Sequence, residues 1–557
     1  MHFEDLLEEI GSFGLYQRVL CFVLIPFTTG ICALTFYSQL FILTAPPHVC
    51  RPGGGPEGGE AGLFLGKVVE LLNATDHDNS AIKAYSCHRF SANESLPPGQ
   101  LMNVTSLSQL PPPDVPCDSG WDYDYDTLFS TLTSEHDWVC DEAWRPYLVV
   151  TAFWVGNTIG SWIFGTISDV YGRRPTILLI ALVYGVAGVA SVFVSDFYGF
   201  LALRTLVGSA HHTLSHLPFV LVVEYCGMDS RVVPLLTIMM TYTTASILAP
   251  SLAWLVWDWR ILALLSSTPI LLVLLMYRWI PESSSWLITR GRTQLATKQL
   301  ETVAKINKRT LPGEKVNQLV SEGGDKSDEA AGEVASQSVI QVVRYRHLRN
   351  SILLVLLVWM LGCMCYYGHC QNTAHLGSNM FTSYLLGAAV EIPSWSAPWL
   401  INRLGRRLPL TVLFLLSGGA SVLYALVPLD MEWLSLTLAL VGRSTITGAY
   451  YITLQYGPEV FPTVVRGQGV ALAETLGGVA IFLSPSIVYL GEILTTLPLL
   501  VFGGLSVIGG AATLFLPETN GVVLPQTLPQ AERFCHRAAR PFCRSKIEEE
   551  TEMEAAT

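Results

Sequence analysis

The sequence predicts an all-α membrane protein whose twelve transmembrane helices form two six-helix bundles, with a large extracellular loop after the first helix. Its 557 residues are 50% hydrophobic and 14% charged, whereas a soluble chain usually carries about 25% charge. The apolar residues also fall into charge-poor runs long enough to cross a bilayer, which takes roughly 20 residues. The third observation is an internal repeat, which places the same charged motifs in both halves of the chain.

The internal repeat consists of three charged motifs that recur in the same order. An acid and a base seven positions apart recur after 235 residues, a Gly-Arg-Arg motif after 233 and a Pro-Glu motif after 236. The copies are Gly172-Arg173-Arg174 with Gly405-Arg406-Arg407, Glu224 and Arg231 with Glu459 and Arg466, and Pro281-Glu282 with Pro517-Glu518. Three motifs in register predict two structurally similar halves of about six helices each.

Twelve apolar runs give the expected spans. They lie near 19–44, 147–165, 176–194, 197–224, 232–256, 261–280, 352–370, 380–401, 409–428, 434–456, 468–490 and 494–516. The expected divisions are an N-terminal segment 1–18, a first bundle 19–280, a linker 281–349, a second bundle 350–516 and a tail 517–557.

The loop over 46–143 is rich in acids, whereas the short loops at 172–174 and 403–407 are basic. Because Lys and Arg accumulate on the cytoplasmic side, we expect this loop outside and both termini inside. Three N-glycosylation acceptors in the loop agree with this orientation: Asn73, Asn93 and Asn103. Four cysteines predict two disulfides with three possible pairings: Cys50, Cys87, Cys117 and Cys140.

Several function classes lack support in the sequence. The net charge of −12 does not resemble the footprint of a nucleic-acid-binding protein. We find no glycine loop of the P-loop type and no catalytic constellation, so we expect neither an enzyme nor a pump driven by ATP hydrolysis. No cofactor and no metal are expected.

A further set of motifs identifies the chain with a known family. The motifs are Pro281-Glu-Ser-Ser-Ser-Trp286-Leu, Glu459-Val-Phe-Pro-Thr-Val-Val-Arg466, Pro517-Glu-Thr, Cys117-Asp-Ser-Gly-Trp121 and Asp258-Trp-Arg260. Together they resemble the organic cation/anion/zwitterion transporter family of the major facilitator superfamily. The chain is most similar to invertebrate organic cation transporters, the relatives of carnitine, carcinine and β-alanine transporters. The resemblance implies the major facilitator fold and transport by alternating access.

The repeated charged motifs correspond to the cytoplasmic latches of that superfamily. The resemblance therefore implies a cytoplasmic gate made by Asp169, Gly172, Arg173, Arg174, Glu224, Arg231, Arg406, Arg407, Glu459 and Arg466. The alternative is that the basic loops only set the orientation of the chain in the membrane.

Span eleven departs from the family pattern. Cation-preferring relatives have an Asp twelve positions after the equivalent of Arg466, and anion-preferring relatives have an Arg there. This chain has Gly478, with Glu474 one helical turn earlier on the same face. A carboxylate inside a span is a functional candidate, so Glu474 is expected to bind substrate. The alternative is a place in the gate network.

Other residues inside spans are also candidates for the substrate site. The full set of substrate-binding candidates is Glu474, Glu391, Arg443, Tyr366, Tyr367, His211 and Ser215. Arg443 could instead form a neutral structural pair with Glu391 or Glu474. His212 and His216, four residues apart, could form a polar cavity wall, a proton path or, as the weakest alternative, a metal site.

The sequence thus predicts a secondary-active or facilitative plasma-membrane transporter of small organic cations or zwitterions. The expected partners are that substrate, the lipid bilayer and, if transport is coupled, an ion. An organic-anion exchanger and a transporter-like receptor that binds without transport remain the alternatives. Substrate identity, coupling ion and oligomeric state are not fixed by the sequence.

Overall fold

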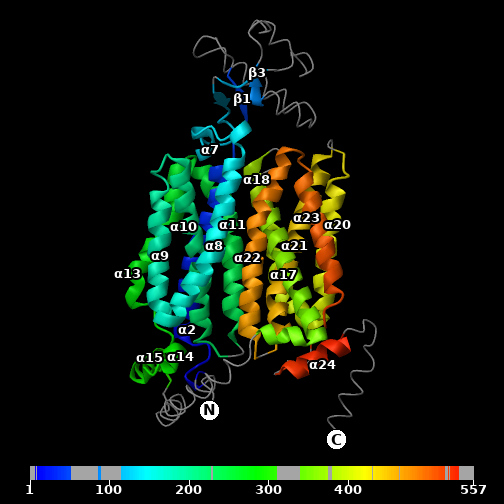
Figure 1. Cartoon of the computed structure of the whole chain (residues 1–557). Helices are drawn as coiled ribbons and strands as arrows, with labels where there is room; N and C mark the ends of the chain where they lie inside the picture. Colours follow the sequence, from blue (N-terminus) through cyan, green and yellow to red (C-terminus); the bar gives the residue numbers. More distant parts are fainter. Residues whose placement is uncertain are drawn as a thin grey trace.

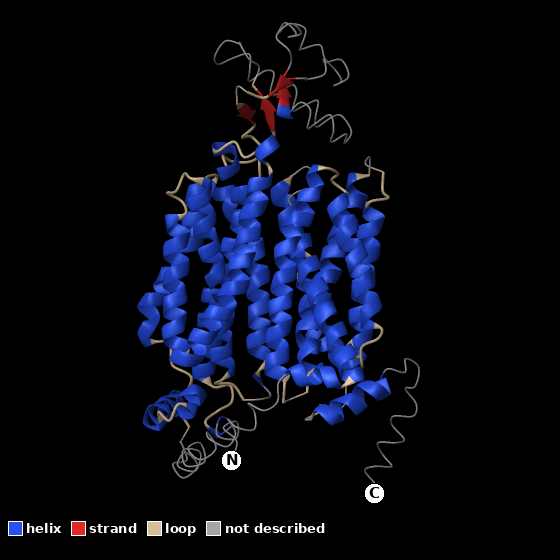
Figure 2. Ribbon diagram, in the orientation of Figure 1, coloured by secondary structure: helices blue, strands red, loops and turns tan. Residues whose placement is uncertain are grey.

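The computed structural model describes residues 7, 9–51, 86–89, 115–118, 120–227, 230–309, 339–373, 379–428, 431–462, 464–520, 525 and 527–538. Long helices run side by side in two groups, which follow one another along the chain (Figure 1). A small region with strands lies beyond one end of the helices (Figure 2), and the last described helical segment, residues 528–538, lies beyond the other (Figure 1). We call these the loop end and the terminal end.

The helices of the first half lie at the positions of the first six expected spans. They are α2 (Leu15–Val19), η1 (Leu20–Leu24) and α3 (Ile25–Leu43), α8 (Trp144–Tyr171), α9 (Arg173–Ala190), α10 (Phe197–Val223), α11 (Val232–Val256), and the series α12 (Trp259–Ser267), η5 (Thr268–Leu271), α13 (Leu272–Leu275) and η6 (Met276–Arg278). Two short helices follow at the terminal end, α14 (Ser284–Thr289) and α15 (Thr293–Ile306).

The second half repeats this order. It consists of η7 (Val339–Arg344), α17 (Arg346–Asn372), α18 (Met380–Ala389), η9 (Ile392–Ser396), α19 (Ala397–Leu404), α20 (Arg407–Tyr424), α21 (Glu432–Val460), α22 (Arg466–Tyr489), η10 (Leu490–Glu492), α23 (Leu497–Thr513) and α24 (Leu528–Ala538). The two halves meet where α8 packs against α22 and α11 packs against α18.

Helical segments lie at all twelve expected ranges, with one clear difference from expectation. Within the described part of the chain, nine helices are long and apolar enough to cross a membrane. The expected span over 380–401 is not one continuous helix, because α18 ends at Ala389 and η9 begins at Ile392. Pro393 lies at this break and has no backbone N–H to continue the ladder. The break places Glu391 between two helical segments.

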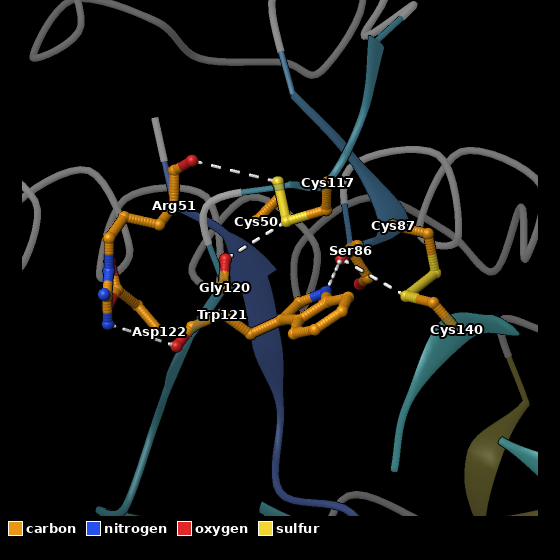
Figure 3. Close-up of a disulfide and its surroundings, with 9 residues drawn as sticks. All are labelled: Cys50, Arg51, Ser86, Cys87, Cys117, Gly120, Trp121, Asp122 and Cys140. Carbon is orange, nitrogen blue, oxygen red and sulfur yellow. Dashed lines mark hydrogen bonds and ion pairs between the residues drawn. A yellow bond between two sulfur atoms is a disulfide. The ribbon is translucent and has the colours of Figure 1, made fainter. Parts of the chain in front are cut away.

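The loop end carries a small disulfide-linked region. Strand β1 (His48–Cys50) pairs antiparallel with β4 (Trp121–Tyr123), and β2 (His88–Arg89) pairs with β3 (Val115–Pro116). The disulfides join Cys50 to Cys117 and Cys87 to Cys140, which selects one of the three possible pairings (Figure 3). The short helix α7 (Leu132–Glu135) and the turn η3 (Cys140–Glu142) lead into α8. The expected glycosylation acceptors, Asn73, Asn93 and Asn103, lie outside the described residues.

The repeated Pro-Glu motifs cap helices at the terminal end. Glu282 accepts hydrogen bonds from the backbone N–H groups of Arg173 (2.7 Å) and Arg174 (3.3 Å) at the start of α9. In the second half, Glu518 accepts from Arg406 (2.9 Å) and Arg407 (3.1 Å) where α20 starts. A carboxylate there satisfies orphan donors and complements the positive end of the helix dipole. The repeat is therefore structural as well as sequential.

The first helix of each half is also capped from the terminal end. The side-chain amide oxygen of Asn307, just after α15, accepts a hydrogen bond from the backbone N–H of Tyr16 (3.0 Å) at the start of α2. Glu532 of α24 accepts from His347 (3.1 Å) and Leu348 (2.7 Å) at the start of α17. Each half thus has two polar caps that fix its helix starts relative to each other.

The capped turns require glycine. Gly172 has φ 106° and ψ 168°, and Gly405 has φ 84° and ψ 178°. This region of backbone space is essentially restricted to glycine. A Cβ atom on Gly172 would also lie 2.5 Å from an oxygen of Glu282, so no larger residue fits beside the cap.

Gly172→Ala is expected to destabilise the protein by about 1–3 kcal/mol, because the backbone conformation is strained and the Glu282 cap is displaced. Gly165→Ala is the matched control, since it lies on α8 and a Cβ there has nothing within 4 Å. Thermal unfolding of the purified protein should show a lower Tm for Gly172→Ala and no decrease for Gly165→Ala. Equal Tm values would contradict the cap.

Candidate functional site

The expected gate residues form one ion-pair cluster in each half. The Arg173 guanidinium lies 3.3 Å from the Glu224 carboxylate, and that of Arg406 lies 3.1 Å from Glu459. Both arginines also donate to a backbone carbonyl five residues earlier in the chain. These bonds join elements of the same half, so in this conformation each cluster holds its own bundle together.

The two clusters differ in one acid. Arg173 also pairs with Asp169 at 3.0 Å, but the corresponding position in the second half is Asn402. There, Arg406 donates instead to the Asn520 side chain at 2.6 Å. The remaining gate candidates lie beside these clusters: Arg174 over the Tyr277 ring, Arg407 on the Leu514 carbonyl, Arg466 on the Phe461 carbonyl, and Arg231 at the start of α11. The ion-pair clusters therefore contain Asp169, Arg173 and Glu224 in the first half and Arg406 and Glu459 in the second, and the other gate candidates contact other groups.

Glu391 and Arg443 form a fully buried ion pair. Arg443 donates from Nε (3.2 Å) and Nη2 (2.8 Å) to Oε1 of Glu391, and from Nη1 to Thr373 at 2.8 Å. The side chains are 2% and 0% exposed for Arg443 and Glu391. The pair is neutral overall, as in the predicted alternative in which Arg443 pairs with Glu391. Its second carboxylate oxygen, Oε2, makes no hydrogen bond to the described residues.

An aromatic cluster lies where the halves meet. The Tyr367 ring of α17 is 4.6 Å from that of Trp154 on α8 and 6.0 Å from that of Phe36 on α3, both in the first half. The adjacent residue of α17, Tyr366, stacks on Tyr450 of α21 with ring centroids 4.7 Å apart. Tyr367 therefore touches both halves, and Tyr366 also lies beside Tyr37 of α3 in the first half. Aromatic faces of this kind bind quaternary and primary ammonium groups.

Glu474 faces the first half rather than its own bundle. Its carboxylate lies 3.8 Å from Nε2 of His212 on α10, and the two side chains are 41% and 31% exposed. The His212 ring stacks on that of His216 with centroids 4.1 Å apart. Glu474 and His212 therefore form a contact between the two halves in which both side chains stay partly accessible.

Gly478 explains why span eleven has no charge at the family position. A Cβ atom there would lie 2.5 Å from the Thr158 hydroxyl of α8. α22 and α8 pack tightly at this point, so a larger residue at position 478 requires the Thr158 side chain to move. The carboxylate one turn away, at Glu474, lies beyond the tight contact.

Two expected substrate residues lie in the first bundle's interior. His211 is 3% exposed and packs among Phe153, Trp154 and Tyr184, and Ser215 is 1% exposed. His211 Nδ1 has no hydrogen-bond partner among the described residues, whereas the Ser215 side chain lies beside Cys32 and Tyr242. It is the neighbouring His212 that reaches the space between the halves. Because His211 and His212 are adjacent, helical spacing alone could not tell which one faces Glu474.

Sequence reasoning also missed a buried cation. Arg204 on α10 is 1% exposed, with its guanidinium 5.1 Å from the Phe200 ring centroid. Its Nε and Nη2 have no hydrogen-bond partner among the described residues. The signal was available, since an Arg inside an apolar run is rare and functional by default.

A cavity of about 500 Å³ lies at the loop end between the two halves. The strand region covers it with His48 and the disulfide between Cys87 and Cys140, and the helices line it with Gln371, Tyr384 and Glu492. The Tyr147 hydroxyl donates to Glu492 at 3.1 Å, which joins the halves across this cavity. Among the described residues, no group of three or more His, Cys, Asp or Glu side chains is placed to hold a metal ion.

Comparisons with known proteins show which family the chain belongs to. Residues 122–527 match the family model described as "Sugar (and other) transporter". The chain is 30% identical to Organic cation transporter 1 of Caenorhabditis elegans, covering 96% of this chain and 88% of that one. It is 32% identical to the Beta-alanine transporter (96% and 89% covered) and 30% identical to the Carcinine transporter (95% and 79%), both of Drosophila melanogaster.

A solved structure shares the fold. The inward open conformation of the xylose transporter XylE from E. coli superimposes with a TM-score of 0.54 and 14% identity, covering 92% of this chain and 98% of that one. The predicted two-bundle fold and the family resemblance are therefore confirmed. The chain belongs to the sugar (and other) transporter family of the major facilitator superfamily, among the organic cation, carnitine, carcinine and β-alanine transporters, and it is a multi-pass membrane transporter rather than an enzyme.

Proposed function

We propose that the chain carries small organic cations across the plasma membrane, with zwitterions as the second candidate class. In this proposal the loop end is extracellular, the terminal end is cytoplasmic, and the two halves rock about the space between them. The observation that carries the proposal is the partly exposed Glu474 carboxylate, which faces the opposite half inside the membrane. A carboxylate in that position can replace part of the hydration shell of an ammonium group.

The balance of charges favours a cation over an anion. Arg443 is 2% exposed and already bonded to Glu391, so it is not available to a substrate carboxylate without breaking a buried pair. Glu474, in contrast, is 41% exposed. The aromatic faces of Tyr367, Trp154 and Tyr450 lie along the same junction and suit the methyl groups of a quaternary ammonium.

A buried oxygen atom of Glu391 supports zwitterions as the second class of substrate. Oε2 of Glu391 has no hydrogen-bond partner among the described residues, and the neighbouring Arg443 is the matching cation. A zwitterion that entered between them could bond to both charges at once, so the exchange would leave no charge unpaired. Relatives with this preference include the Beta-alanine transporter.

The loop-end cavity supports an entry route in this proposal. Glu492 would attract a cation to the extracellular mouth, and Tyr147 would have to release Glu492 when the halves separate there. The gate clusters at Glu224 and Glu459 would keep each bundle rigid while it moves. In this proposal the gate residues hold each half rigid in the conformation described here. In other conformations they form contacts between the two halves.

The main test is uptake into proteoliposomes of four radiolabelled compounds: tetraethylammonium, carnitine, β-alanine and carcinine. Saturable uptake of at least one compound is expected, and Glu474→Gln should raise its KM at least tenfold, since a hydrogen bond to a charged group contributes about 1.5–3 kcal/mol. Glu301→Gln, an exposed carboxylate on α15, is the control and should match wild type. Binding without saturable flux would support a receptor instead, and uptake of p-aminohippurate alone would support an anion exchanger.

A second prediction separates the structural and substrate roles of the buried pair. Glu391→Gln alone is expected to destabilise the protein by about 3–5 kcal/mol, because it leaves the Arg443 charge uncompensated in the interior. Glu391→Met with Arg443→Met should recover most of that loss, which differential scanning of the purified variants would measure as Tm. If the double variant also keeps wild-type carnitine uptake, the pair has no role in binding zwitterions.

A further inference from the structure

Arg204 carries a charge in the interior of the first half that no acid compensates in the described part of the chain. It lies on α10, two turns after the helix begins, and is 1% exposed. A guanidinium stays protonated in proteins, so the cation persists where α10 crosses the membrane. Among the titratable groups of the described residues, it interacts electrostatically with the Tyr184 phenol alone. The other arginine buried to this degree, Arg443, is paired with Glu391.

The Phe200 ring compensates only part of this charge. The guanidinium carbon of Arg204 lies 5.1 Å from the centroid of that ring, which comes one turn earlier on the same helix. A cation–π contact attracts the cation but leaves its net charge unchanged. Two of its donors, Nε and Nη2, make no hydrogen bond to the described residues. Because an unpaired charge and unmade hydrogen bonds are costly inside a membrane, Arg204 requires a group that is both negative and an acceptor.

Four helices of the first half form a ring around the interior that Arg204 enters. Helix α10 packs on α3 and on α9, and α12 also packs on α3 and on α9, so the ring is closed. The Thr35 hydroxyl of α3 donates to the Ser266 carbonyl of α12 at 2.8 Å, and Tyr184 of α9 lies beside Thr35. Arg204 of α10 interacts with the same Tyr184. All four helices therefore contribute polar groups near the level of the guanidinium.

The ring offers hydrogen-bond donors but no carboxylate, since α3, α9, α10 and α12 contain no Asp or Glu. Its buried side-chain atoms without a hydrogen-bond partner among the described residues include Ser38 Oγ and the Gln39 amide on α3, and Ser267 Oγ on α12. Ser267 lies beside Gly188 of α9. Hydroxyl and amide N–H groups can donate to an anion, but they cannot neutralise a cation. Water could also accept from Arg204, yet it would leave the charge uncompensated.

The segment that follows α7 closes the loop end of this ring. Trp138 is 3% exposed, and its ring lies 6.2 Å from the Phe200 ring beside the guanidinium. The acid of α7, Glu135, is engaged with Arg260 at the start of α12, so it does not serve as the partner of Arg204. A ligand held beneath Trp138 is shielded from bulk water, which strengthens its attraction to the arginine.

We infer that the ring of α3, α9, α10 and α12 binds one small monovalent anion, such as chloride, beside the Arg204 guanidinium. One negative charge neutralises the arginine, whereas a divalent anion would leave a new uncompensated charge inside the membrane. The anion accepts hydrogen bonds from Nε and Nη2 of Arg204. Because Arg204 is 1% exposed and lies within one bundle, the site excludes molecules of substrate size. The anion stabilises the first half, and this role does not depend on which substrate the protein carries.

The test measures thermal unfolding of the purified full chain while sodium chloride replaces sodium gluconate at constant ionic strength. Gluconate is the reference because it is too large for a buried site. The wild-type Tm should rise with chloride and reach a plateau about 2 °C higher, since a ligand that binds only the folded state stabilises it. Bromide should act alike, and in bromide-grown crystals its anomalous signal should lie beside Arg204. A Tm that ignores chloride overturns the inference, as does bromide found only elsewhere.

Arg204→Met removes the charge and keeps a long apolar side chain. Its Tm is expected to ignore chloride and, in gluconate, to be no lower than that of the wild type, because the uncompensated charge is gone. An arginine that only packs would instead give a lower Tm in both salts. Arg309→Met is the control, since Arg309 is exposed, and it should keep the wild-type response to chloride. Chloride stabilisation that persists in Arg204→Met contradicts the site.

A second variant covers the case in which Arg204→Met does not fold. Arg204→Lys keeps the charge but loses the planar fork of donors. It should need at least tenfold more chloride than the wild type for half of the full increase in Tm. An unchanged chloride requirement would place the anion elsewhere and reject the inference.

Discussion

The arrangement of this protein depends on one constraint: a charge placed inside a membrane span must be compensated or be accessible to water. Glu391 and Arg443 meet it by pairing completely within the second half. Glu474 meets it by facing His212 across the junction, where both side chains remain partly exposed. The first pair is internally neutral in one bundle, whereas the second exists only while the two bundles are adjacent. The second is therefore the one that domain movement can make or break.

The repeat at the terminal end joins the helices within each half. In each half a Pro-Glu carboxylate caps the helix that follows the Gly-Arg-Arg motif, and an arginine of that motif pairs with an acid at the end of the fourth or tenth span. These bonds stay inside a half, so rotation of one bundle against the other does not strain them. The symmetry breaks at Asp169, which pairs with Arg173 and is largely exposed, because the corresponding residue of the second half is Asn402.

Sequence reasoning reached the two-bundle fold and the motifs because both leave linear signals, apolar runs and short charged patterns. It identified Glu474, Glu391 and Arg443 because charges are conspicuous in apolar sequence. It left two questions open that depend on rotation about a helix axis. Nothing in the spacing says that His212 rather than His211 faces the junction, or that Arg443 pairs with Glu391 rather than Glu474. The broken eighth span was missed because its apolar composition hides the change of conformation at Glu391 and Pro393.

Gly478 connects the packing of the halves with the chemistry between them. Because α22 and α8 approach closely at Thr158, a side chain at the position where relatives carry a charge would require Thr158 to move. A carboxylate one turn away escapes that contact and gains a titrating partner on the opposite helix. Tight helix packing at one glycine therefore determines which turn of α22 carries the carboxylate that faces the first half.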